Sequence, residues 1–203
     1  YFMAAIPFID PTEADIAMFS SYDFLFNLNH LVSMATFGIL GAVMGTRFVI
    51  EEYSGAKVIL LFSYPISRKK MMGAKLCLVF CYPVAAMLLC GIVTGGMFFF
   101  SESLFPLCVD HLTWETIGWA FLFLLCHSLL AGAVALLSIW IGFLKKSIPV
   151  TIVTAVITAT ILCQVLSAAF SFRPVLFILL GVAAILTMVA VRSMFYQVEN
   201  MEV

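Results

Sequence analysis

Five long apolar stretches restrict the fold of this chain more than any other feature. They run approximately over residues 24–50, 71–100, 114–143, 148–170 and 174–191. A bilayer core about 30 Å thick needs roughly 17–25 apolar residues per helix, so each stretch is long enough to span it. The mean hydropathy is +1.16 and only 10% of residues are charged, which excludes an ordinary soluble domain. The polar–apolar alternation of membrane barrels is missing, so we predict an all-α membrane protein.

The basic residues orient the predicted spans. Cytoplasmic loops of membrane proteins collect Lys and Arg. Most basic residues here fall on one side of the spans: Arg47, Lys57, Arg68, Lys69, Lys70, Lys75, Lys145, Lys146 and Arg192. Arg173 falls on the other side, together with these acidic residues: Asp10, Glu13, Asp15, Asp23, Glu102, Asp110 and Glu115. We therefore expect the basic side, with the carboxyl terminus, to be cytoplasmic.

The first residues of the chain predict one more span. The sequence YFMAAIPFI reads as the tail of a helix that begins before Tyr1. With that helix the protein would have six spans and both termini in the cytoplasm. Residues 1–23 would then be an extracellular segment, and residues 24–203 the transmembrane domain, of which five helices are visible.

Two patterns bear on packing within the membrane. GxxxG pairs at residues 41–45 and 91–95 would let helix backbones approach closely. Cys77 and Cys81 share a helix face at i, i+4 spacing, without a His or carboxylate beside them. Core packing is therefore favoured over metal binding for these two thiols.

The sequence shows neither the ionisable residues of ion-coupled transporters nor the phosphate-binding motif of an ATPase. Ion-coupled transporters hold ionisable residues within the membrane, whereas here His127 is the titratable side chain in mid-span. No carboxylate accompanies His127, so a hydrogen bond to a neighbouring helix is favoured over a proton relay. The phosphate-binding pattern GxxxxGK[ST] is absent, because the GAK sequences at Gly55 and Gly73 lack the earlier glycine and the following hydroxyl. Energy for uphill transport must then come from a partner protein.

The charged stretch between the first two predicted spans, EEYSGAKVILLFSYPISRKKMMGAK (residues 51–75), resembles a segment of a known family. It is similar to the stretch after the second transmembrane helix in type-2 ABC transporter permeases. That pattern has Glu, then Gly, then Leu-Leu-Ser-x-Pro-x-Ser-Arg, and later a Lys that opens the third helix. The matching residues are Glu51 or Glu52, Gly55, Leu60, Leu61, Ser63, Pro65, Ser67, Arg68 and Lys75. Phe62 interrupts the leucine run.

The resemblance implies a cytoplasmic coupling segment over residues 51–68, whose first part, residues 51–62, docks on a separate ATPase subunit. The expected contacts are Glu51, Glu52, Tyr53, Gly55, Ala56, Lys57, Leu60 and Leu61. Acidic residues suit the start of such a helix because of its dipole. Arg68, Lys69 and Lys70 would anchor the next helix at the anionic inner leaflet. This chain would bind no cofactor itself, since the partner would hold ATP and Mg²⁺.

The resemblance also implies a six-helix permease bundle that pairs with a second permease subunit, identical or different, in a bacterial plasma membrane. In the family, the spans over residues 24–50 and 148–170 face the subunit interface. Asn27, His30, Thr160 and Gln164 are therefore candidates for the substrate path, with hydrogen bonds across helices as the alternative role of the polar residues in the 148–170 span. The 20 phenylalanines and the uncharged span interiors favour a hydrophobic or amphipathic cargo, such as a peptide or a drug, over an ion, with export as the direction that the resemblance implies. No nucleic-acid partner is expected.

Two other functions stay open from the sequence. Glu51 and Glu52 are similar to the paired glutamates of prenyl-protein endopeptidases, a class of intramembrane protease. In that class an Arg follows after three residues, where this chain has Ala56, and neither His30 nor His127 fits the remaining pattern. The third reading is a non-pumping membrane immunity or scaffold protein, which would show no dependence on ATP.

Overall fold

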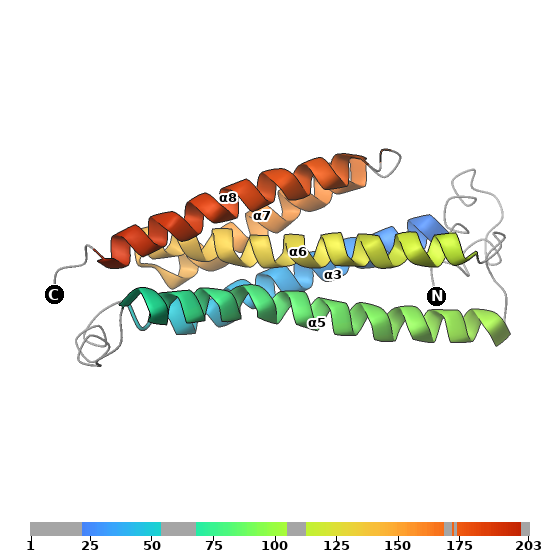
Figure 1. Cartoon of the computed structure of the whole chain (residues 1–203), viewed down its shortest axis with the longest axis horizontal. Coiled ribbons are helices and arrows are strands. Elements are labelled where there is room, and N and C mark those ends of the chain that lie inside the picture. Colours follow the sequence, from blue (N-terminus) through green and yellow to red (C-terminus); the bar gives the residue numbers. More distant parts are fainter. Residues whose placement is uncertain (1–21, 54–67, 105–112, 169–171, 173, 200–203) are drawn as a thin grey trace.

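The computed structural model describes residues 22–53, 68–104, 113–168, 172 and 174–199. The regular structure in these ranges is entirely helical. Helix α3 (Tyr22–Gly45) continues into a π-helical turn, η1 (Thr46–Ile50), and the other helices are α5 (Arg68–Leu104), α6 (Trp114–Lys145), α7 (Ile148–Ala168) and α8 (Pro174–Glu199). Figure 1 shows these helices as one elongated bundle in which successive helices run in opposite directions.

Five helices in the described ranges are long and apolar enough to cross a membrane. The sequence prediction of an all-α, multi-pass membrane protein is confirmed at that level. Each predicted apolar stretch corresponds to one of these helices, with α3 and η1 together forming the first.

Helix ends differ from the predicted span ends because hydropathy marks the membrane edge, whereas a helix can continue into water. Helix α5 runs over Arg68–Leu104 instead of 71–100, and at about 1.5 Å per residue its 37 residues reach about 55 Å, well beyond a bilayer core of about 30 Å. Helix α8 continues to Glu199 instead of ending at residue 191. The first span is not one uniform helix, since its last five residues form η1.

Charged residues separate to the two ends of the bundle. The alternating helix directions bring η1, the start of α5, the α6–α7 turn and the end of α8 to the same end, on the left in Figure 1. This basic end carries the following described cations: Arg47, Lys69, Lys70, Lys75, Lys145, Lys146 and Arg192. At the opposite, acidic end the described charged residues are Asp23, Glu102 and Glu115. The segregation predicted from the sequence is present in the fold.

Helix α6 lies at the centre of the bundle and is packed against α3, α5, α7 and α8. Close approach of α3 depends on the 41–45 glycine pair, as predicted. A Cβ at Gly41 would lie 2.9 Å from the Pro83 ring of α5 and 3.1 Å from Ala135 of α6. In the 91–95 pair, a Cβ at Gly91 would meet Leu124, whereas one at Gly95 would meet nothing within 4 Å. In the second GxxxG pair, therefore, only Gly91 lies at a contact between helices.

The turn between α6 and α7 is the tightest junction at the basic end. Lys146 adopts a left-handed conformation (φ 48°), and Ser147 N donates to Gly142 O at 3.1 Å, which satisfies a carbonyl at the end of α6. The side of α6 at Gly142 is filled by the first turn of α7. A Cβ at Gly142 would lie 1.7 Å from Thr151 Oγ1 and 2.9 Å from Ile50 Cδ1.

Two packing predictions are wrong. Cys77 and Cys81 are exposed on α5, with their Sγ atoms 3.8 Å apart, and do not lie in the core. The threonines of α7 do not reach across to other helices either. Thr154, Thr158 and Thr160 each donate to a carbonyl of α7 itself, at 2.7–2.9 Å. A hydroxyl in a helix has such a carbonyl within reach one turn back, whatever its neighbours are.

Candidate functional site

The π-helical turn η1 ends the first span and directs the chain toward the neighbouring helices. Glu51 N donates to Thr46 O at 3.0 Å, and Tyr53 N donates to Val49 O at 3.2 Å. The Thr46 hydroxyl donates a hydrogen bond to Val43 O, 2.6 Å away. Single π turns are rare and frequently accompany functional sites. Here the turn sets the direction in which residues 51–53 leave the membrane span.

Lys75 on α5 joins the end of this turn in two ways. Its ammonium forms an ion pair with Glu52, and it lies 5.0 Å above the ring centroid of Tyr53, in reach of a cation–π interaction. The side chains of Lys75 and Glu52 are only 16% and 37% exposed, so water screens this pair less than a surface pair. Lys69 and Glu199, also at the basic end, form an ion pair of 2.9 Å with both side chains more than half exposed.

Tyr53 inserts its ring into the core at the basic end. It is 2% exposed, and its ring lies edge-on to Phe143 of α6, with centroids 5.9 Å apart. It belongs to an apolar cluster with Val49 of η1 and Met72 of α5. The residues Glu52, Tyr53, Lys75 and Phe143 are called the basic-end cluster below. This cluster joins α3, α5 and α6 at one point.

The hydroxyl of Tyr53 is buried and finds no hydrogen-bond partner among the described residues. Burial, and then the negative charge of Glu52, raise the pKa of Tyr53 from 10.0 to about 12. An unfolded tyrosine loses its proton first, so Tyr53 contributes stability that is fully present below about pH 10. That contribution is lost as the pH rises from 10 toward 12.

A Tyr53→Phe variant should therefore be as stable as the wild type, or more stable by up to about 1 kcal/mol, because it removes an unsatisfied buried hydroxyl. It should also lose less stability than the wild type between pH 10 and 12. Tyr53→Ala should cost about 3–5 kcal/mol, since it leaves a cavity in the core. Thermal unfolding in detergent, followed by circular dichroism below pH 10 and again above it, checks both. A Phe variant that is much less stable than wild type would show that the hydroxyl has a partner.

The predicted coupling segment is only partly described. Glu51 and Glu52 are half-buried and Tyr53 is buried, whereas Gly55, Ala56, Lys57, Leu60 and Leu61 lie outside the described residues. Arg68 is the first residue of α5, with its side chain outside the described part, and Lys69 and Lys70 are exposed. Sequence reasoning used Lys75 only as a pattern match and missed Phe143. Glu52 follows the first apolar stretch and Lys75 lies near the start of the second, so both were expected at the same side of the membrane, and this shared position is the signal that could have paired them.

The four candidates for the substrate path do not share one surface within a single copy of the chain. Asn27 is half-buried and donates from Nδ2 to Asp23 O, one turn back, at 2.8 Å. His30 is buried at 4% exposure and faces into the bundle. Thr160 and Gln164 are exposed on the outer side of α7.

His30 of α3 and His127 of α6 face each other in the core, with ring centroids 5.9 Å apart. His127 Nδ1 lies 2.8 Å from Phe123 O of its own helix, so the predicted hydrogen bond to a neighbouring helix is wrong. No group of three or more His, Cys, Asp or Glu in the described ranges could hold a metal ion. Along α3, His30 and Glu51 are about 30 Å apart at 1.5 Å per residue, too far to share a metal.

The chain is 30% identical to YcbO of Bacillus subtilis (strain 168) over 183 residues, which is 90% of this chain and 79% of YcbO. YcbO is described as an uncharacterized protein, so its name carries no activity. No protein-family model matches the chain, and no solved structure matches it.

Proposed function

This chain belongs to the same family as Bacillus subtilis YcbO, and we propose that it is the membrane-spanning permease subunit of an ATP-driven exporter of the type-2 ABC kind. Its basic end faces the cytoplasm of a bacterium. There the segment beginning at Glu51 contacts a separate ATPase subunit that binds ATP and Mg²⁺. Two permease subunits together move a hydrophobic or amphipathic substrate across the plasma membrane.

The basic-end cluster is the observation that carries this proposal. A loop that transmits force must be fastened to the helices at the points where it leaves and returns. Glu52 and Tyr53 precede residues 54–67, and Lys75 lies two turns into the helix that follows them. The Glu52–Lys75 ion pair ties these two sides to each other, and Tyr53 ties both to Phe143 of α6. A push on the segment would therefore move three helices together, as in rigid-body switching.

The charge distribution supports the orientation. Described cations gather at one end of the bundle, and an excess of Lys and Arg marks the cytoplasmic side of membrane proteins. Helices α5 and α8 are also long enough to extend past the bilayer core. An ATPase subunit would thus meet helical surface in water around the coupling segment.

The exposed surface of α7 supports a second permease subunit. Thr160, Gln164 and Ser167 form a polar strip over its last turns. Polar side chains of membrane helices commonly pack against other helices. The exposed residues in the middle of α8, such as Ile178 and Ile185, are apolar and suit lipid. A second copy facing the α7 strip would supply partners that lipid tails do not.

The proposal is tested by co-expressing the full chain with a candidate ATPase subunit and measuring the mass of the purified membrane complex. We expect a stable complex with two copies of each subunit. The contrasting variant carries Glu51→Lys and Glu52→Lys, which changes the half-buried start of the segment without leaving a core cavity, and it should lose the ATPase while remaining in the membrane. If the wild-type chain purifies without any ATP-binding subunit, a non-pumping immunity or scaffold role replaces the exporter.

A further inference from the structure

A groove of about 590 Å³ lies between α3 and α5, toward the acidic end of the bundle. Its size falls within the roughly 300–1,000 Å³ of small-molecule sites. Phe26 of α3 and Phe98 of α5 line it and meet edge-on, with ring centroids 5.4 Å apart. Val32 and Met97, which also line it, are more than half exposed, so the groove opens on the side of the bundle. Molecules dissolved in the bilayer can therefore enter it directly.

The groove has free space beside Gly95. Gly95 lines the groove, and a Cβ there would have no atom within 4 Å. Gly96 has equally free space but is not part of the lining. The space beside Gly95 is thus not needed for packing in the described part of the bundle. A larger side chain at position 95 can therefore fill the groove without disturbing the fold, and position 96 provides a matched position outside it.

The polar groups of the groove favour a hydrogen-bond donor. Thr94 Oγ1 donates to Cys90 O at 2.8 Å, and Ser101 Oγ donates to Phe98 O at 2.9 Å. Because their hydrogens are used within α5, both hydroxyls offer only lone pairs to a ligand. The exposed carboxamide of Asn29 on α3 offers both an acceptor oxygen and a donor NH2 group. The acceptor hydroxyls of α5 therefore favour a ligand that carries hydrogen-bond donors.

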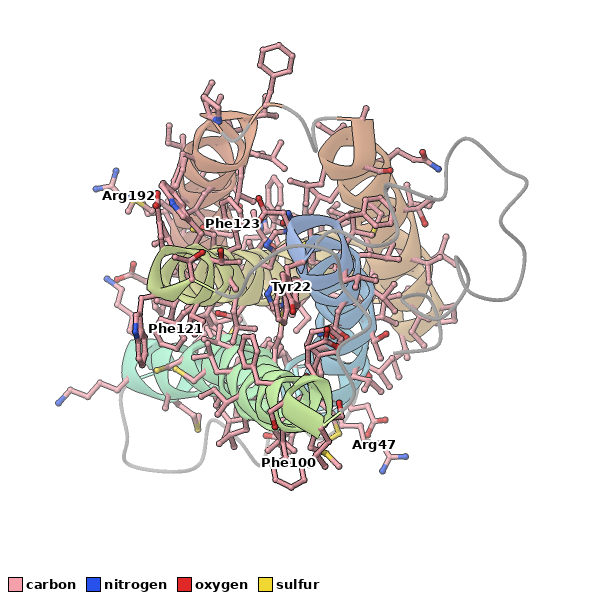
Figure 2. All side chains as sticks on the ribbon, turned by 90° about the vertical axis from the view of Figure 1, so that its right-hand side faces the viewer. Tyr22, Arg47, Phe100, Phe121, Phe123 and Arg192 are labelled. Atoms are coloured by element: carbon pink, nitrogen blue, oxygen red, sulfur yellow. The ribbon has the colours of Figure 1, made fainter. Side chains whose placement is uncertain are left out.

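The charge around the groove has the matching sign. Glu102 follows Ser101 on α5 and accepts a hydrogen bond from the Tyr22 hydroxyl at 3.2 Å. Seen from the acidic end, Tyr22 points into the bundle whereas Phe100 projects away from it (Figure 2). The charged groups described at this end are acidic, so the local field attracts cations and repels anions.

We propose that the groove between α3 and α5 is a binding site for an amphipathic amine. The protonated amine donates to Ser101, the polar lining residue nearest the acidic end, and the apolar tail runs from there along Phe98, Phe26 and Val32. This site does not depend on the proposed export function, because its described lining residues all come from α3 and α5 of one chain. It goes beyond that function by naming a class of ligand and the site at which the ligand binds.

The test is photolabelling of the purified full-length chain in nanodiscs of zwitterionic lipid, without ATP or any partner. The probe is an alkylamine carrying a diazirine in its tail, and the labelled peptides are located by mass spectrometry. Unlabelled dodecylamine, dodecanol and dodecanoic acid serve as competitors with equal tails. We expect labelling of α3 and α5 and competition by the amine at about tenfold lower concentration than by the other two.

The decisive comparison is Gly95→Leu against Gly96→Leu. Gly95→Leu fills the groove and should lower labelling at least about tenfold, while Gly96→Leu should stay within about twofold of wild type. Equal loss in both variants, or equal competition by dodecanoic acid, would overturn the site. A change of oligomeric mass in Gly95→Leu alone would instead show that another copy of the chain fills the groove. This experiment uses neither ATP nor an ATPase subunit. A negative result would therefore reject the amine site without bearing on the exporter proposal.

Discussion

Charge reversal at Glu52 or Lys75 is expected to lower ATP turnover of the assembled complex at least about tenfold, and reversal of both together to restore most of it. Each single change places two like charges next to each other in a partly buried contact, where the coupling segment begins. Removing one partner of a buried pair costs about 3–5 kcal/mol, and a pair as exposed as this one should cost less. The double change, Glu52→Lys with Lys75→Glu, re-forms the ion pair with its charges exchanged.

The matched control is the exposed pair at the same end, Lys69 with Glu199. Reversing either of its charges should change stability by less than about 1 kcal/mol and leave turnover near wild type. Turnover is measured as phosphate release in proteoliposomes at equal amounts of complex. If the Glu52 and Lys69 variants behave alike, or if the exchanged pair recovers nothing, the basic-end cluster does not transmit the signal.

Among the described glycines, Gly142→Ala should be the most damaging single methyl addition. The new Cβ would lie 1.7 Å from Thr151 Oγ1 and 2.9 Å from Thr151 Cβ, and the latter atom moves only with the backbone of α7. Overpacking of this kind typically costs about 1–3 kcal/mol. The strain would fall where η1, α6 and α7 meet, so the variant should lower both the unfolding temperature and the yield of folded protein.

Gly181→Ala is the control for this substitution, since a Cβ at Gly181 of α8 meets nothing within 4 Å. It should leave the unfolding temperature unchanged or slightly raise it, because Ala is the better helix former. Adding Thr151→Ala to Gly142→Ala should recover part of the loss by removing the nearest atom. Thermal unfolding in detergent measures all three, and equal stability of the Gly142 and Gly181 variants would contradict the close contact.

The sequence was sufficient to predict the number of visible spans and the separation of charge, because both depend only on depth in the membrane. Apolar runs of about 20 residues place Phe24 and Met71 inside the bilayer, and clusters such as Lys145 with Lys146 outside it. The continuation of α8 from Arg192 to Glu199 was missed for the same reason. Hydropathy marks where the hydrocarbon core of the membrane ends, but it does not mark where the helix ends.

Sequence reasoning failed at several positions where the direction around a helix mattered. A helix that is apolar on all sides has no polar face to orient it. For that reason Cys77 and Cys81 were placed in the core but are exposed, and Gly95 was paired with Gly91 but faces open space. The contact between Glu52 and Lys75 depends on the register of α3 against α5. The same register brings Gly41 close to the Pro83 ring, and no local pattern reveals it.

The most direct test of the central claim is the ATP turnover of a candidate ATPase subunit in liposomes, with and without this chain. The account predicts that the ATPase is bound to the membrane and turns over ATP only when the chain is present. It also predicts that an amphipathic substrate leaves the side that carries the ATPase. An ATPase that hydrolyses ATP at the same rate with and without the chain, and that moves no substrate in either case, would contradict the account.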